Sequence, residues 1–110
     1  MRSLTENEKK LLRLLLEKSD FEINIEEIGV CDIEDGQMGS LRFISSRLYQ
    51  DRQMGKIISE MVFKDADNIP ISVNLSVDDK GVLYELDIWK VDFSKVEIYP
   101  SKETLMKAVG

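Results

Sequence analysis

The stretch YELDIWKVDF, residues 84–93, carries the side chains of this sequence that are best suited to binding a ligand. It contains the only tryptophan of the chain, Trp89, together with the carboxylates of Glu85 and Asp87 and the amine of Lys90. An aromatic ring beside carboxylates and an amine can form a polar binding site. These four residues are therefore the candidate binding surface.

The same stretch also has a purely structural interpretation. Its even-numbered positions are apolar as far as Ile88, whereas from Trp89 onward the odd-numbered positions are apolar. A slip of the apolar side by one residue is typical of a β-bulge, or of a central strand whose second half is covered by a helix. Both interpretations stay open: a bulged strand, or a polar site formed by Glu85, Asp87 and Lys90 beside Trp89.

The composition excludes the commonest catalytic chemistries. The chain has no histidine, and so it lacks the usual general base and the usual ligand of transition metals. Its one cysteine, Cys31, can form neither an internal disulfide nor a zinc site of several thiolates, and its apolar neighbours predict a buried structural thiol. We therefore predict no catalytic residues, no metal ligands and no cofactor, in a protein that is not an enzyme.

Several loops resemble ligand-binding motifs but lack the residues that define them. The loop GQMGS (36–40) has two glycines, yet it lacks the lysine of a phosphate-binding loop and precedes a predicted strand. The acidic segments 32–36, 65–68 and 78–81 do not have the ligand spacing of a calcium loop. Asp, Asn and Gly are common in turns for local reasons, so we interpret all four as turns.

The charge of the chain points away from nucleic acid and leaves a basic protein partner or a bound cation open. Fifteen basic and 21 acidic residues give a formal charge of −6. Nucleic acid and anionic membranes both require a cationic surface, so neither is an expected partner. No apolar run approaches the roughly 20 residues that span a bilayer, and the charged N-terminus does not resemble a signal peptide. These features predict a soluble, cytoplasmic protein.

The N-terminal segment predicts a helix over about residues 6–18. Thr5 and Glu8 have the spacing of a capping box, and the leucines that follow have a helical period. Residues 21–29 are ambiguous, because they alternate like a strand but also match one capped helical turn. A short helix is the favoured prediction for them.

The rest of the chain has the alternating pattern of strands joined by short turns. Residues 70–78, PISVNLSVD, form the clearest half-buried strand, and 65–68 and 78–81 are hairpin-length turns. Residues 101–110 predict a short C-terminal helix. The order of these elements predicts a single α+β domain over residues 1–110, with an N-terminal helix packed on a meandering antiparallel sheet of about four to five strands.

Three blocks of the sequence resemble the signature of a known family. The segments MGSLRF (38–43), ISEMVFKDAD (58–67) and YELDIWKVDF (84–93) are similar, in order and spacing, to blocks of a family of small bacterial domains of unknown function. The opening LTENEKKLLRLLL also fits this family. The resemblance implies a single-domain bacterial protein, and it implies no activity and no catalytic residues.

Two functions of different classes remain open at the level of sequence. The first is a non-enzymatic acidic interaction module that binds a basic protein partner, by analogy of size and charge with immunity proteins. Such a module would be a monomer or an edge-strand homodimer. The alternative is a small-ligand-binding or enzymatic domain with a polar site around Asp87, Trp89 and Lys90.

Overall fold

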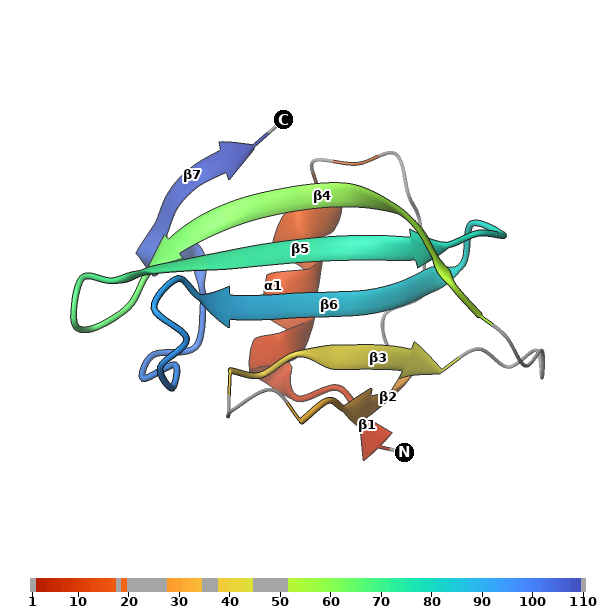
Figure 1. Cartoon of the computed structure of the whole chain (residues 1–110), viewed down its shortest axis with the longest axis horizontal. Helices are drawn as coiled ribbons and strands as arrows, with labels where there is room; N and C mark the ends of the chain where they lie inside the picture. The colour runs from red at the N-terminus through yellow and green to blue at the C-terminus, as the bar shows by residue number, and fades with distance from the viewer. Residues whose placement is uncertain (1, 18, 20–27, 35–37, 45–51, 110) are drawn as a thin grey trace.

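The computed structural model describes the chain except for residues 1, 18, 20–27, 35–37, 45–51 and 110. The described part contains seven strands, which form one sheet in the order β1-β2-β3-β6-β5-β4-β7, with all neighbours antiparallel (Figure 1). The elements are β1 (Arg2–Ser3), α1 (Glu6–Leu16), β2 (Gly29–Asp32), β3 (Leu41–Ile44), β4 (Met54–Lys64), β5 (Pro70–Asp78), β6 (Leu83–Lys90), the 3-10 turn η2 (Lys102–Thr104) and β7 (Leu105–Val109).

The predicted fold class, a helix on a sheet of about four to five strands with a short C-terminal helix, is wrong. Strands dominate the described residues, and the sheet has seven of them beside the single α-helix α1. The last residues form β7, which pairs with Glu60–Phe63 on the outer side of β4. A helix of so few residues is marginal on its own, whereas pairing with β4 satisfies the backbone of one side of β7.

The N-terminal helix and its capping box are confirmed. The backbone N–H of Glu8 donates to the Thr5 hydroxyl at 3.2 Å, and the N–H of Thr5 donates to the Glu8 carboxylate at 2.8 Å. Leu11, Leu12 and Leu15 are buried on the side of α1 that faces the sheet. Most of the ambiguous segment 21–29 lies outside the described residues.

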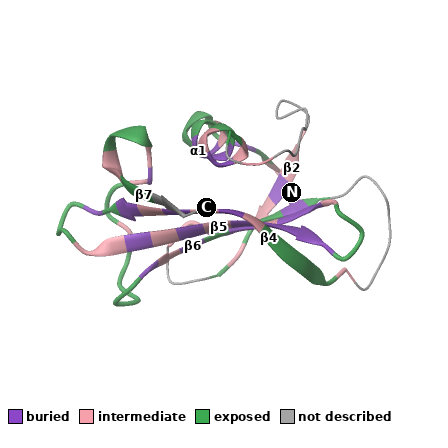
Figure 2. Cartoon of the chain, turned by 90° about the horizontal axis from the view of Figure 1, so that it is seen from above, coloured by how far each residue is buried: buried purple, intermediate pink, exposed green. Residues whose placement is uncertain are grey.

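The sheet has one covered face and one open face. Figure 2 shows α1 lying along one side of the sheet, while no helix or strand of the described residues forms a layer on the other side. Strand β5 shows the division clearly, because Ile71, Val73 and Leu75 are fully buried and the polar residues between them point the other way. We call the side opposite α1 the open face.

Two further observations complete the fold. No helix in the described ranges combines the length and the apolar character needed to cross a membrane. At the start of β4, a Cβ atom added to Gly55 would lie 2.4 Å from the carbonyl oxygen of Asp78. The start of β4 and the turn that follows β5 are therefore in direct backbone contact, at a place where a side chain has no room.

Candidate functional site

Strand β6 divides the four predicted site residues between the two faces of the sheet. Glu85, Asp87 and Trp89 lie on the open face, whereas Lys90 is buried on the side of α1. The predicted slip in alternation after Ile88 is wrong, because β6 pairs with β5 in unbroken register from Lys90 to Glu85. The irregularity of this pair lies instead at the other end of β6, before Glu85.

Lys90 explains why the pattern of apolar residues in β6 wrongly predicted a bulge after Ile88. Its exposed fraction is 1%, and its Nζ lies 3.0 Å from Oδ2 of Asp65 and also forms an ion pair with Asp67. Burial alone lowers the pKa of Lys90, but the hydrogen bonds to Asp67 and Asp65 outweigh that effect and raise it. A lysine therefore occupies an inward position that an apolar residue would normally fill.

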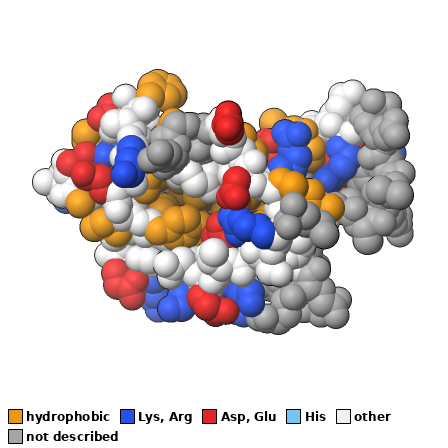
Figure 3. Space-filling view, turned by 90° about the horizontal axis from the view of Figure 1, so that it is seen from below, with side chains coloured by type: hydrophobic (Ala, Val, Ile, Leu, Met, Phe, Trp, Pro, Cys, Tyr) orange, Lys and Arg blue, Asp and Glu red, His pale blue; other side chains and the backbone are white. Residues whose placement is uncertain are grey.

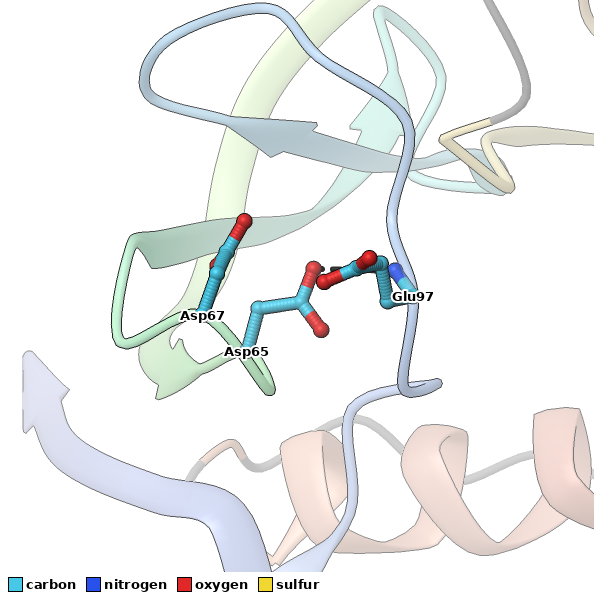
Figure 4. Close-up of side chains that lie close together, drawn as sticks. All are labelled: Asp65, Asp67 and Glu97. Carbon is cyan, nitrogen blue, oxygen red and sulfur yellow. Dashed lines mark hydrogen bonds between the residues drawn. The ribbon is translucent and has the colours of Figure 1, made fainter.

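Three carboxylates surround this region, and we call them, with Lys90, the Lys90 cluster. Carboxylate oxygens of Asp65, Asp67 and Glu97 lie within 4.8 Å of one another (Figure 4). Three such oxygens have the chemistry of a site for a hard cation. Here the Lys90 ammonium already contacts the two aspartates, so the cluster carries its own cation.

Asp65 is the centre of the Lys90 cluster. Besides the Lys90 ammonium, its carboxylate accepts the backbone N–H of Glu97 at 2.9 Å, of Ile98 at 2.8 Å and of Ala66 at 2.7 Å. These bonds join the turn after β4 to the segment that follows β6 (Figure 4). The residue types of 65–68 predict only a turn. A lysine at an inward strand position was the signal that a buried carboxylate had to lie nearby.

We expect the protein to lose stability as Asp65 is protonated. Burial raises the pKa of Asp65, but the backbone hydrogen bonds and Lys90 outweigh it and lower the pKa from 3.8 to about 2. Because the folded-state pKa is the lower one, the stabilisation is complete above about pH 4 and is lost as the pH falls toward 2. Urea unfolding between pH 5 and pH 2 should show this loss, and Asp65→Asn should make the dependence of stability on pH shallower over the same interval. An unchanged dependence in the variant would contradict the assignment.

The open face carries two parallel rows of side chains across its central strands. The register of β4, β5 and β6 places one row at Glu60, Asn74 and Asp87 and the next at Val62, Ser72 and Trp89. Neighbours across antiparallel strands lie about 5 Å apart, so each row is continuous. Alternation along β6 therefore brings three of the four predicted residues, Glu85, Asp87 and Trp89, onto one surface.

Some polar side chains of the open face have hydrogen-bond or ion-pair partners, and one buried polar atom has none among the described residues. One Asp87 carboxylate oxygen accepts the Ser40 hydroxyl at 3.2 Å, and Glu85 forms an ion pair with Arg42 of β3. The Asn74 side-chain oxygen is buried and has no hydrogen-bond partner among the described residues. A buried acceptor that lacks a donor typically costs about 1–3 kcal/mol.

Exposed apolar side chains lie beside the open face, at the end of β6. Val91 is 49% exposed and Phe93 75% exposed, and Phe93 has a left-handed backbone with φ of 62°. The backbone N–H of Phe93 donates to the Lys90 carbonyl at 2.8 Å, which closes a tight turn. Seen from the β1 edge, hydrophobic side chains are interspersed with charged ones along the visible surface, including this end of the sheet (Figure 3).

A groove of about 620 Å³ lies on the other side of the molecule, between α1 and residues 98–103. Its lining mixes charges of both signs, among them Lys10, Arg13 and Glu103. Burial raises the pKa of Tyr99, which also lines the groove. None of the four predicted site residues belongs to this lining, so the groove and the open face are separate features.

Comparison with known proteins finds one family whose profile matches the chain. The profile of a family described as "Domain of unknown function (DUF6984)" matches residues 1–100. No curated protein and no solved structure matches the chain. The matched range includes the Lys90 cluster and both rows of the open face, and its description assigns no activity that could be transferred to them.

Proposed function

The chain belongs to this DUF6984 family, a family without an assigned function, and we propose from its open face that it is a non-enzymatic module that binds a basic protein partner. The open face is the observation that carries the proposal. A sheet with one solvated face usually displays only polar side chains there. Here a half-buried tryptophan, Trp89, stands between polar neighbours, and tryptophan is among the residues enriched at the energetic centres of protein interfaces.

Two carboxylates in one row of the open face support a basic partner. Asp87 and Glu60 lie on either side of Asn74, in the row next to Trp89. The whole chain carries a formal charge of −6, and an acidic protein attracts a cationic one over long distances and accelerates their association. A small acidic domain that neutralises a cationic toxin would use such a surface, although that comparison is one of size and charge.

The alternative, a small-ligand or enzymatic site around Asp87, Trp89 and Lys90, has less support. Such a site requires the three side chains to converge. Lys90 is buried on the side of α1 and is held by Asp65 and Asp67, whereas Asp87 is exposed on the open face. The lysine is thus engaged elsewhere and does not face the other two residues.

A charge reversal on the open face tests the proposed function. Asp87→Lys should lose the proteins that the immobilised wild-type domain retains from a lysate of its native host, because the variant repels a basic partner. Glu17→Lys makes the same change in charge at the end of α1, away from the open face, and should retain the same proteins. Retention by the wild type should weaken as salt is raised. If Asp87→Lys folds, as judged by its thermal unfolding, and retains the same proteins as Glu17→Lys, the proposal is wrong.

A further inference from the structure

We infer that the groove between α1 and residues 98–103 binds a small organic anion, an amphipathic molecule with an apolar body and a carboxylate. The volume of the groove, about 620 Å³, lies within the range of about 300–1,000 Å³ that small-molecule sites occupy. No residue of the two rows on the open face belongs to its lining. The inference therefore goes beyond the proposed function and does not depend on it.

Apolar side chains line the groove on both of its sides. Leu14 belongs to α1, and Ile98 and Tyr99 belong to the segment that precedes η2. Ile98 is 45% exposed, and Leu14 and Tyr99 are only partly buried although both pack against the core. The hydroxyl of Tyr99 is buried, so this residue offers its ring to a ligand. An apolar body in the groove would remove these surfaces from water, which is favourable in proportion to the area covered.

Two lysines, one on each side of the groove, can pair with the carboxylate of the ligand. Lys10 belongs to α1 and Lys102 to η2, and both are exposed. Within the described part of the chain, neither ammonium group forms an ion pair or a hydrogen bond. Hydrogen bonds to its own backbone N–H and to Ser101 lower the pKa of Glu103, and the charges of Lys10 and Lys102 lower it further. Both lysines therefore act on the same part of the groove, beside Glu103.

The charge of the lining is opposite in sign to the charge of the whole chain. Three basic side chains line the groove, against two acidic ones among the described residues, Glu17 and Glu103, whereas the chain carries −6. Arg13 is one of the three and already has an interaction partner, so Lys10 and Lys102 carry the argument. Glu103 competes with a ligand carboxylate for these two lysines, and removal of its charge should therefore strengthen binding.

Displacement of a fluorescent anion measures binding in the groove. We would titrate the full chain with anilinonaphthalene sulfonate, whose fluorescence rises when its aromatic body leaves water, and then displace this dye with decanoate. The inference predicts saturable binding of the dye and displacement by decanoate. Decanol has an apolar chain of the same length without the charge, and it should displace the dye about tenfold more weakly, as expected when two exposed ion pairs are lost. Inorganic phosphate has the charge without the apolar chain and should also displace it more weakly than decanoate.

Two double variants separate the lysines of the groove from the net charge of the chain. Lys10→Gln combined with Lys102→Gln should weaken the binding of decanoate about fivefold or more, because both ion pairs with the carboxylate are lost. Lys56→Gln combined with Lys107→Gln removes the same charge from β4 and β7, outside the lining, and should bind decanoate as the wild type does. All four lysines are exposed, so both double variants should fold.

Two single variants test the apolar wall and the competing carboxylate. Ile98→Ser should weaken the binding of decanoate about threefold, because the groove loses part of its apolar surface. Glu103→Gln should tighten binding about twofold, because the two lysines are then free of a neighbouring negative charge. The first variant measures the contact with the apolar body, and the second measures the contact with the carboxylate.

Each of four results would overturn the inference: no saturable binding of the dye, displacement by decanol or by phosphate as strong as by decanoate, equal affinities of the two double variants for decanoate, or undiminished binding by Ile98→Ser. Thermal unfolding shows whether each variant is folded. The proposed function fails separately, because it depends on the retention of protein partners and on its loss in Asp87→Lys, and Asp87 does not line the groove.

Discussion

Asp65→Ala is expected to lower the free energy of unfolding by about 3–5 kcal/mol, the usual effect of breaking a buried ion pair. The variant leaves the Lys90 ammonium buried with Asp67 as its remaining carboxylate partner. It also removes the acceptor of three backbone N–H groups, those of Ala66, Glu97 and Ile98. Urea unfolding at neutral pH measures the loss.

Asp67→Asn is the matched control for this prediction. The Asp67 side chain is more than one third exposed, and in this variant Asp65 still pairs with Lys90, so the control should lose less stability than Asp65→Ala. Adding Lys90→Met to Asp65→Ala should recover part of the loss, because the ammonium left behind is then replaced by an apolar chain. An Asp65→Ala variant that loses less than the control would show that the Lys90 cluster does not hold the two segments together.

Gly55→Ala is expected to produce the second large loss, about 3 kcal/mol or more, at the upper end of what overpacking costs. The added Cβ would lie 2.4 Å from the Asp78 carbonyl oxygen, 2.7 Å from the Asp78 carbonyl carbon and 3.0 Å from the Asp79 Cα. All three are backbone atoms, so no side chain can rotate to relieve the contact. The start of β4 or the turn after β5 would have to move.

Gly81→Ala separates this steric effect from backbone strain. Gly81 has a left-handed φ of 82° and nothing within 4 Å of an added Cβ, so its substitution strains the backbone and meets no atom. The expected loss is about 1–2 kcal/mol. Equal stabilities of the two variants in thermal or urea unfolding would contradict the close contact at Gly55.

The parts of the fold that were predictable from the sequence are those with local causes. A capping box and a leucine stripe lie within α1 itself, and the alternation of β5 is complete within its own residues. The edge strands β1 and β7 are different. They are two and five residues long, and each depends on a partner far away in the chain, Val30 for β1 and the segment 60–63 for β7. The residue pattern of such a short strand does not identify the distant segment with which it pairs.

The candidate site was predictable to the same extent. Period-two alternation was enough to place Glu85, Asp87 and Trp89 on one face of β6. Alternation also places Lys90 on the face of Leu86 and Ile88, but a charged residue there was interpreted as a change of the apolar side, whereas the tertiary structure provides Lys90 with buried carboxylates. Asn74 was overlooked because a polar residue in a half-buried strand is ordinary until its neighbours and the burial of its oxygen are known.

Phe93 and Asn68 adopt the same backbone conformation, with φ of 62° and 68°. Asparagine is a common residue there, while a bulky aromatic residue is a rare one that makes folding harder. Under selection for folding alone, random substitution at position 93 would drift toward glycine or asparagine. If relatives of this protein keep a phenylalanine at this position, the exposed ring itself is under selection. Such conservation would indicate a functional role of the ring, which measurements of stability do not detect.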